Sequence, residues 1–244
     1  MHARTVAVRG ISDFCVFALA LLLSSCGGGG GGDSGSAGGG TQAIGYVKAS
    51  NSGAGDWFGV SVALSGDGNT LAVGARYEAS STTGIDSAPN ELAANAGAVY
   101  VYTRSAGTWS QQAYVKASNT GAGPGDQFGF SVALSSDGNT LAVGAPFEDS
   151  STTGIGSTPD EAAGQAGAVY VFTRSAGTWS QQAYVKASNT GAADQFGFSV
   201  ALSGDGNTLA VGALNEASST TGIDSTPNES AIGAGSVYVY TRSG

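Results

Sequence analysis

The residues best suited to chemistry in this sequence are carboxylates, and most of them fall in three long polar segments. These segments cover residues 77–96, 147–166 and 214–234, and each one separates two apolar runs. Carboxylate, amide and backbone oxygens are the ligands that Ca²⁺ prefers. A solvated acidic surface, or one that attracts a basic partner, is the alternative interpretation. The candidate calcium ligands are Glu78, Asp86, Glu91, Glu148, Asp149, Asp160, Glu161, Glu216, Asp224 and Glu229.

The sequence contains few of the histidine and cysteine residues that nucleophilic catalysis and zinc binding use. The only histidine is His2, and the only cysteines are Cys15 and Cys26. Ser-His-Asp and Cys-His systems, and zinc sites of imidazoles or paired thiolates, need residues that the rest of the chain lacks. The carboxylates lie in Gly- and Ser-rich segments without aromatic enclosure, which disfavours a hydrolase that uses two carboxylates. We therefore expect a protein that is not an enzyme.

The tripeptide Asp-Gly-Asn occurs three times, each time between two apolar alternating runs. Gly and Asn tolerate positive φ angles, so this tripeptide favours a tight β-hairpin turn over a binding site. The predicted turn residues are Asp67, Asn69, Asp137, Asn139, Asp205 and Asn207.

The N-terminal segment is typical of an export signal. Arg4 and Arg9 precede an apolar run over residues 14–23, which is too short for a permanent membrane span and predicts a leader over residues 1–25. The run ends in Leu-Ser-Ser followed by Cys26, which resembles the lipobox of bacterial lipoproteins. That resemblance implies that Cys26 becomes a lipidated N-terminus. Ordinary signal cleavage near the same place is the alternative.

Lipidation would anchor the protein to a membrane, because several acyl chains together hold a protein almost permanently. Gly27 follows the cysteine, and in lipoproteins of this kind a residue other than Asp implies an outer-membrane or cell-surface location. Residues 26–43 are rich in Gly and Ser, a composition typical of a flexible tether.

The net charge argues against nucleic acid as a partner. The chain has 9 basic and 18 acidic residues, a net charge of −9. Loss of the leader would remove Arg4, Arg9 and Asp13 and leave about −10. Nucleic-acid binding depends on Lys and Arg side chains that neutralise phosphates. We therefore expect no nucleic-acid partner.

The remaining sequence, residues 44–244, is built from three repeats. The segment Tyr-Val-Lys-Ala-Ser-Asn begins at Tyr46, Tyr114 and Tyr184, which divides the chain into repeats over about 46–113, 114–183 and 184–244. In the second repeat, β-type alternation predicts four strands, over residues 128–135, 140–145, 168–173 and 179–186.

The third of these strands is apolar on both faces, so each small sheet must be covered on both sides by its neighbours. The sequence therefore predicts an all-β fold: a β-propeller-like array of three four-stranded antiparallel blades.

The spacing of three motifs resembles the FG-GAP repeat of integrin α-subunit propellers and their bacterial relatives. The second repeat has Phe128-Gly129, then Gly144-Ala145-Pro146, then an alternating Val and aromatic strand; the other repeats carry Arg76 and Leu214 in place of the proline. The resemblance implies a non-catalytic binding or adhesion module with an extracellular protein or glycan as its partner. Integrin-like propellers hold calcium in an Asp-rich turn between strands 1 and 2, whereas each corresponding turn here has one carboxylate.

The number of blades is compatible with more than one assembly. Propellers have four to eight blades, and this sequence supplies three. A lone copy of the fourth strand is expected at residues 45–50, and the sequence ends where the last repeat's fourth strand would begin. An open array, a homodimer of six blades and a fragment of a longer protein are all compatible with this pattern. Exposed end strands invite self-association, so a structural, self-assembling homo-oligomer is the alternative function.

Overall fold

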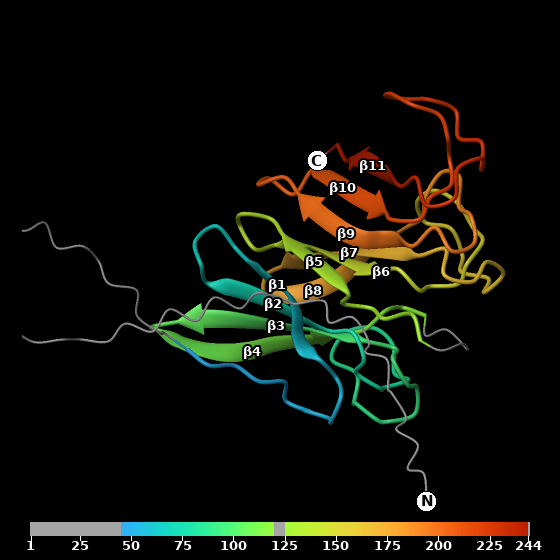
Figure 1. Ribbon diagram of the computed structural model, residues 1–244. Coiled ribbons are helices and arrows are strands. Elements are labelled where there is room, and N and C mark those ends of the chain that lie inside the picture. The colour runs from blue at the N-terminus through green and yellow to red at the C-terminus, as the bar shows by residue number, and fades with distance from the viewer. Residues whose placement is uncertain (1–44, 120–124, 244) are drawn as a thin grey trace, which may run out of the picture. The chain divides into compact units, whose positions relative to one another are not determined.

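The computed structural model describes residues 45–119 and 125–243, and every regular element in these ranges is a β-strand (Figure 1). None of the residues described forms a helix that could cross a membrane. The predicted leader over residues 1–25, the lipidated Cys26 and the tether over residues 26–43 lie outside the described residues. Export and lipidation therefore stay predictions.

The strands form three antiparallel sheets, here called blades, in which neighbours in sequence are neighbours in space. Blade 1 contains β1 (Phe58–Leu64), β2 (Thr70–Ala75), β3 (Ala98–Ser105) and β4 (Thr108–Val115). Blade 2 contains β5 (Ser131–Leu134), β6 (Thr140–Ala145), β7 (Ala168–Ser175) and β8 (Thr178–Val185). Blade 3 contains β9 (Phe196–Leu202), β10 (Thr208–Ala213) and β11 (Ser236–Thr241). The predicted all-β, propeller-like fold is confirmed.

Two details of the predicted fold need correction. Among the described residues, blade 3 has three strands instead of four. Residues 45–50, expected to form a lone fourth strand, are not a strand. A strand needs a sheet edge to pair with, and this segment instead packs against the outer face of blade 1 through Val47 and Ala49.

The blades pack face to face because each sheet has one face of large side chains and one of small side chains and valines. In blade 2, Leu141, Val143 and Tyr170 contact blade 1, where they meet Ala72, Val99 and Val101. Ala142, Val169 and Val171 lie on the opposite face and pack against blade 3. Each layer of apolar contacts therefore joins two consecutive repeats.

The glycines of the repeat lie at these inter-blade contacts. Gly144, in the Gly-Ala step of blade 2, approaches the carbonyl oxygen of Gly197, in the Phe-Gly step of blade 3, so closely that a Cβ atom would not fit. The hydroxyl of Ser131 donates a hydrogen bond of 2.8 Å to the same carbonyl. Gly74, Gly129 and Ser61 repeat the arrangement between blades 1 and 2. The Phe-Gly and Gly-Ala steps are thus the two sides of one backbone contact.

Candidate functional site: the long-loop face and the open third blade

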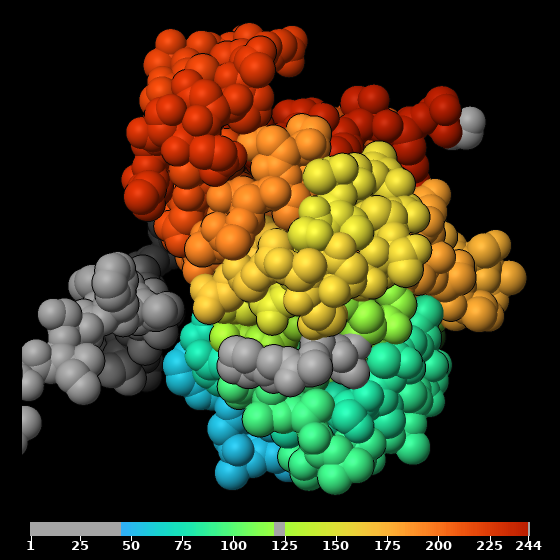
Figure 2. Space-filling model, turned by 90° about the vertical axis from the view of Figure 1, so that its right-hand side faces the viewer, coloured from blue at the N-terminus to red at the C-terminus, as the bar shows by residue number. Residues whose placement is uncertain are grey.

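The three long segments that follow β2, β6 and β10 project from the same end of the blades (Figure 1). The same loops face the viewer in Figure 2, where the segments of the three repeats lie next to one another. We call this surface, formed by residues 77–96, 147–166 and 214–234, the long-loop face. The short hairpin turns lie at the opposite end of the strands.

Each long loop is folded by the same internal hydrogen bonds. In the first loop, the backbone N–H of Ser81 donates to the side-chain oxygen of Asn90 at 2.9 Å, and the Ser80 hydroxyl donates to the Asn90 carbonyl at 2.6 Å. Asp160 and Asn228 accept the equivalent backbone bonds from Ser151 and Ser219. These bonds cross-link each loop over nine or ten residues. The long-loop face is therefore an ordered surface.

A buried glutamate stands at the base of each long loop. Glu78, Glu148 and Glu216 follow the Gly-Ala step by the same spacing, and each is at most 1% exposed. The Lys116 ammonium donates to a Glu78 carboxylate oxygen at 2.8 Å, and the Lys186 ammonium donates to Glu148 at 2.9 Å. Each lysine directly follows the fourth strand of the same blade. These ion pairs join the long loop to the outer edge of its sheet.

The buried pairs keep their glutamates ionised. Burial alone would raise the pKa of Glu148, but the charge of Lys186 and hydrogen bonds from Ser150, Lys186 and Tyr184 more than offset burial and hold this pKa below its ordinary value. Lys116 and Ser80 lower the pKa of Glu78 against the same effect of burial. A carboxylate held in this way serves the architecture of the loop, because its oxygen atoms are already engaged.

The ten predicted calcium ligands are not brought together. Asp86 accepts a hydrogen bond from the backbone N–H of Tyr114, Asp149 accepts one from Gln165, and Asp160 accepts two from Ser151. No group of three or more acidic, histidine or cysteine side chains in residues 45–119 and 125–243 is placed to hold a metal ion. The remaining predicted ligands, Glu91, Glu161, Asp224 and Glu229, are exposed on the loops.

These residues therefore do not fit a shared calcium site. Calcium binding stays a prediction.

The Asp-Gly-Asn segments lie in the turns that join the first two strands of each blade. A carboxylate oxygen of Asp67 accepts hydrogen bonds from the Ser65 hydroxyl at 2.6 Å and the Asn69 backbone N–H at 2.9 Å, and these bonds lower the pKa of Asp67 to about 2. The pKa values of Asp137 and Asp205 are lowered by the same set of hydrogen bonds. Asn69, Asn139 and Asn207 each accept a bond from an arginine, which lies in β3, in β7 and directly after β11 respectively.

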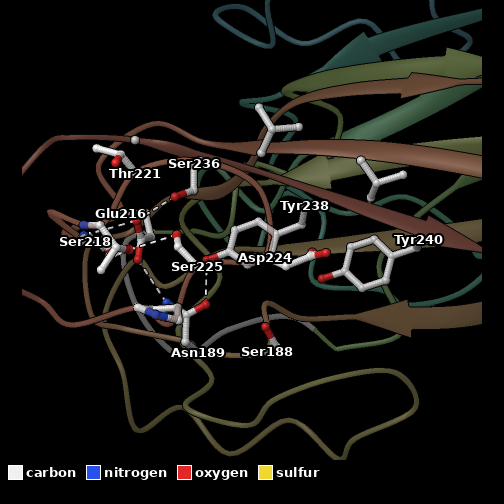
Figure 3. Close-up of a pocket in the computed structure, with 16 residues that line it drawn as sticks. Ser188, Asn189, Glu216, Ser218, Thr221, Asp224, Ser225, Ser236, Tyr238 and Tyr240 are labelled. Atoms are coloured by element: carbon white, nitrogen blue, oxygen red, sulfur yellow. Dashed lines mark hydrogen bonds between the residues drawn. The ribbon is translucent and has the colours of Figure 1, made fainter.

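Blade 3 is hollowed where the other two blades carry their fourth strand. The cavity has a volume of about 930 Å³ and is lined by β11, by the third long loop and by Ser188 and Asn189 (Figure 3). Glu216 lies at one end of it and accepts hydrogen bonds from Asn189 at 3.0 Å, from the Ser236 hydroxyl at 2.6 Å and from the Ser218 backbone N–H at 3.1 Å. In the part of the chain that the structure describes, Glu216 has no lysine partner. The open third blade is thus polar at one end and apolar along β11.

Sequence reasoning missed the lysine of the repeated Tyr-Val-Lys segment as a functional group. A signal was present: Lys116 and Lys186 each follow an apolar strand in the same hexapeptide, and each repeat has a glutamate at a fixed distance after Gly-Ala. A charged side chain that recurs at a fixed position next to an apolar strand is expected to be buried with a partner of opposite charge. The partners could not be paired from the sequence, because 38 residues separate Lys186 from Glu148.

Comparison with known proteins agrees with this architecture. The family model described as FG-GAP repeat matches the chain three times, over residues 46–102, 109–172 and 179–240. Each match contains one Phe-Gly step and one Gly-Ala step, and the contact described above joins consecutive matches. A search of curated proteins finds no match. Since the three matches together cover well over half of the sequence, the chain belongs to the FG-GAP repeat family.

Proposed function

We propose that this protein is a non-catalytic adhesion-type module, exported and displayed at the cell surface as a lipoprotein, that binds its partner through the long-loop face. FG-GAP repeats are consistent with a non-catalytic adhesion-type role. The observation that carries the proposal is that the loops share one hydrogen-bonded frame but differ at their tips. A rigid frame that presents variable loops is a common design for recognition.

The tips differ in a specific way. Directly after the frame residues Asn90, Asp160 and Asn228, the tips carry Glu91-Leu92, Glu161-Ala162 and Glu229-Ser230. The glutamates are exposed, and Leu92 is 80% exposed although it is a large apolar side chain. Each of these tip pairs carries one negative charge, and the first also carries an exposed apolar side chain, which favours an extracellular protein with a basic patch. An uncharged glycan is the other partner to be tested.

Attachment of intact cells tests the binding face. Cells that display the full chain are applied to immobilised basic and acidic matrix proteins and to an array of neutral glycans. We expect retention on a basic protein, with at least a tenfold loss in the Glu91→Gln/Leu92→Ser variant. Gln111→Ala, an exposed substitution on β4 away from the loops, is the matched control. Equal retention of cells with and without the chain on every surface would refute the adhesion proposal.

Labelling with a radioactive fatty acid tests the anchor. We expect the wild-type chain to incorporate label and to fractionate with the outer membrane, and Cys26→Ser to lose the label. An unlabelled wild-type chain that is released into the medium would contradict lipid anchoring and leave the binding face to be judged separately.

A further inference from the structure

The third blade lacks what the first two blades receive from the segment Tyr-Val-Lys. In blade 2, Tyr184 and Val185 end β8, where they pair with Tyr170 and Val169, and Lys186 is fully buried against Glu148. Blade 1 repeats this with Val115 and Lys116. In blade 3, one edge of β11 has no partner strand among the described residues, and Glu216 is as buried as its counterparts but without an ammonium group.

The chain also carries one such segment that completes no blade. Tyr46 is 88% exposed and Lys48 is exposed, whereas Tyr114, Tyr184, Lys116 and Lys186 are all at most 5% exposed. Three copies of the segment and three buried glutamates are thus present. One copy of each is left over.

The residues that follow Tyr46 and Val47 are already placed as if they entered from a preceding blade. The Tyr102 hydroxyl donates to the Lys48 carbonyl at 2.7 Å, as the Tyr240 hydroxyl does to the Lys186 carbonyl at 3.0 Å. The Tyr100 hydroxyl donates to the Asn51 side-chain oxygen at 2.6 Å, which matches Tyr170 with Asn119 and Tyr238 with Asn189. Residues 48–51 therefore occupy the position of an inter-blade link, and Tyr46 and Val47 lie where a fourth strand would end.

The two outer faces of the array carry residues equivalent to those on the two sides of each interface between blades. On β1, Val62 is 63% exposed and Leu64 is exposed, whereas their counterparts Val132 and Leu134 pack against blade 1. A Cβ atom on Gly59 would meet nothing, whereas the equivalent Gly129 meets the backbone of Ala98. The exposed face of blade 1 is therefore equivalent to the face of blade 2 that packs against blade 1.

Blade 3 presents the complementary side. Val237 is 71% exposed and Val239 is exposed, whereas the equivalent Val99 and Val101 are fully buried against blade 2. Gly212 meets only Ser199 of its own blade, whereas Gly74 and Gly144 meet the backbone of the next blade. The open face of blade 3 and the open face of blade 1 therefore carry the residues that already pack together twice within the chain.

We propose that two copies of this chain associate head to tail, and that residues 46–48 of each copy complete blade 3 of the other as its fourth strand. Lys48 of one copy then pairs with Glu216 of the second copy, and Val237 and Val239 pack against Val62 and Leu64 across the joint. Two copies supply six blades, within the range in which propeller rings close. Within one chain, blade 2 separates the two open faces, since β5 contacts β1 on one side and β9 on the other. The association does not depend on the proposed adhesion function.

Site-directed cross-linking tests the strand pairing. In the full chain with Cys15→Ser and Cys26→Ser, the Val47→Cys/Val237→Cys variant is oxidised and run on a non-reducing gel, because Val185 and Val169 are the paired positions in blade 2. We expect a reducible covalent dimer. The matched control, Val47→Cys/Val239→Cys, lies two residues out of register on the same face and is expected to stay monomeric. A monomer with an internal disulfide, no cross-link at all, or equal cross-linking of both variants would overturn the proposal.

Exchange of the two charges tests the ion pair. Sedimentation of the wild-type chain at micromolar concentration is expected to give a dimer, and Lys48→Glu is expected to weaken dimerisation at least about 100-fold, because the partner glutamate is left buried and unpaired. The double variant Lys48→Glu/Glu216→Lys is expected to recover the dimer. Since Lys48 is exposed in the single copy, its substitution leaves the fold intact, so a Lys48→Glu variant that dimerises like wild type would contradict the pairing.

Discussion

Lys186 and Glu148 form an ion pair in which both side chains are fully buried. Removal of one partner from a buried pair leaves a charge without compensation, which costs about 3–5 kcal/mol. We therefore expect Lys186→Met to lower the free energy of unfolding by about that amount, as measured by urea unfolding followed through tryptophan fluorescence. Gln111→Met, at an exposed position of β4, is the control.

The double variant Lys186→Met/Glu148→Leu separates the charge from the packing. Replacement of both partners by apolar groups of similar size removes the buried charge, so most of the lost stability is expected to return. If the single and double variants unfold at the same urea concentration, the loss comes from packing and the ion pair contributes nothing.

The same glutamates give the protein a pH dependence with a defined sign. The pKa of Glu148 in the folded protein lies below its ordinary value of 4.5, because of Lys186 and its hydrogen bonds. A lowered carboxyl pKa contributes stability that is complete above the unfolded value and is lost as the pH falls through the folded value. The melting temperature is therefore expected to stay level from pH 7 to about pH 5 and to fall below about pH 4.5. Glu148→Gln is expected to melt lower at pH 7 and to show a flatter acid limb.

At the scale of the element, the contact between Gly-Ala and Phe-Gly gives the sharpest prediction. Alanine at position 144 would press against the Gly197 carbonyl of the next blade, and such overpacking costs about 1–3 kcal/mol. Alanine at position 212 would meet the Ser199 hydroxyl of its own blade, just as alanine at position 144 would meet the Ser131 hydroxyl. It would meet no backbone atom of another blade. In a single copy, Gly144→Ala is therefore expected to lower the melting temperature more than Gly212→Ala. Equal melting temperatures would show that the backbone contact is not the cause.

The strands could be predicted from the sequence because their alternation is local. Thr140–Ala145 and its copies alternate large and small side chains next to a turn tripeptide, and the hairpins formed as expected. The segment over residues 45–50 was predicted wrongly for a non-local reason. Its sequence is that of a strand end, but a strand also needs a partner edge, and no sequence window carries that information.

The site was predictable only in part. The long loops and their acidic character follow from composition, but the burial of Glu78 and Glu148 depends on lysines that follow the fourth strand of the same blade. Glu216 is buried against hydrogen-bond donors that include Asn189 and Ser236. A carboxylate in a Gly- and Ser-rich segment is usually solvated, so local composition assigned these three residues to the surface. The sheet topology placed them in the core.

At the scale of the whole molecule, the head-to-tail association predicts a stability that depends on concentration. A partner that binds the folded state raises the melting temperature as its concentration rises. Hydrogen exchange is expected to show that amides of β1 and β11 lose protection on dilution, whereas amides of β6, which is buried along its whole length, keep theirs. Protection of β1 and β11 that is independent of dilution would contradict the association.

The repeated backbone contact between blades also bears on how such genes can change in length. Every joint between consecutive repeats uses the same glycines, the same serine hydroxyl and the same apolar layers. A repeat inserted by unequal recombination would therefore find compatible neighbours on both sides without any compensating substitution. Gain or loss of a whole repeat would keep the same contact at every joint, whereas a single alanine at Gly144 disturbs one joint, so selection can act on array length directly.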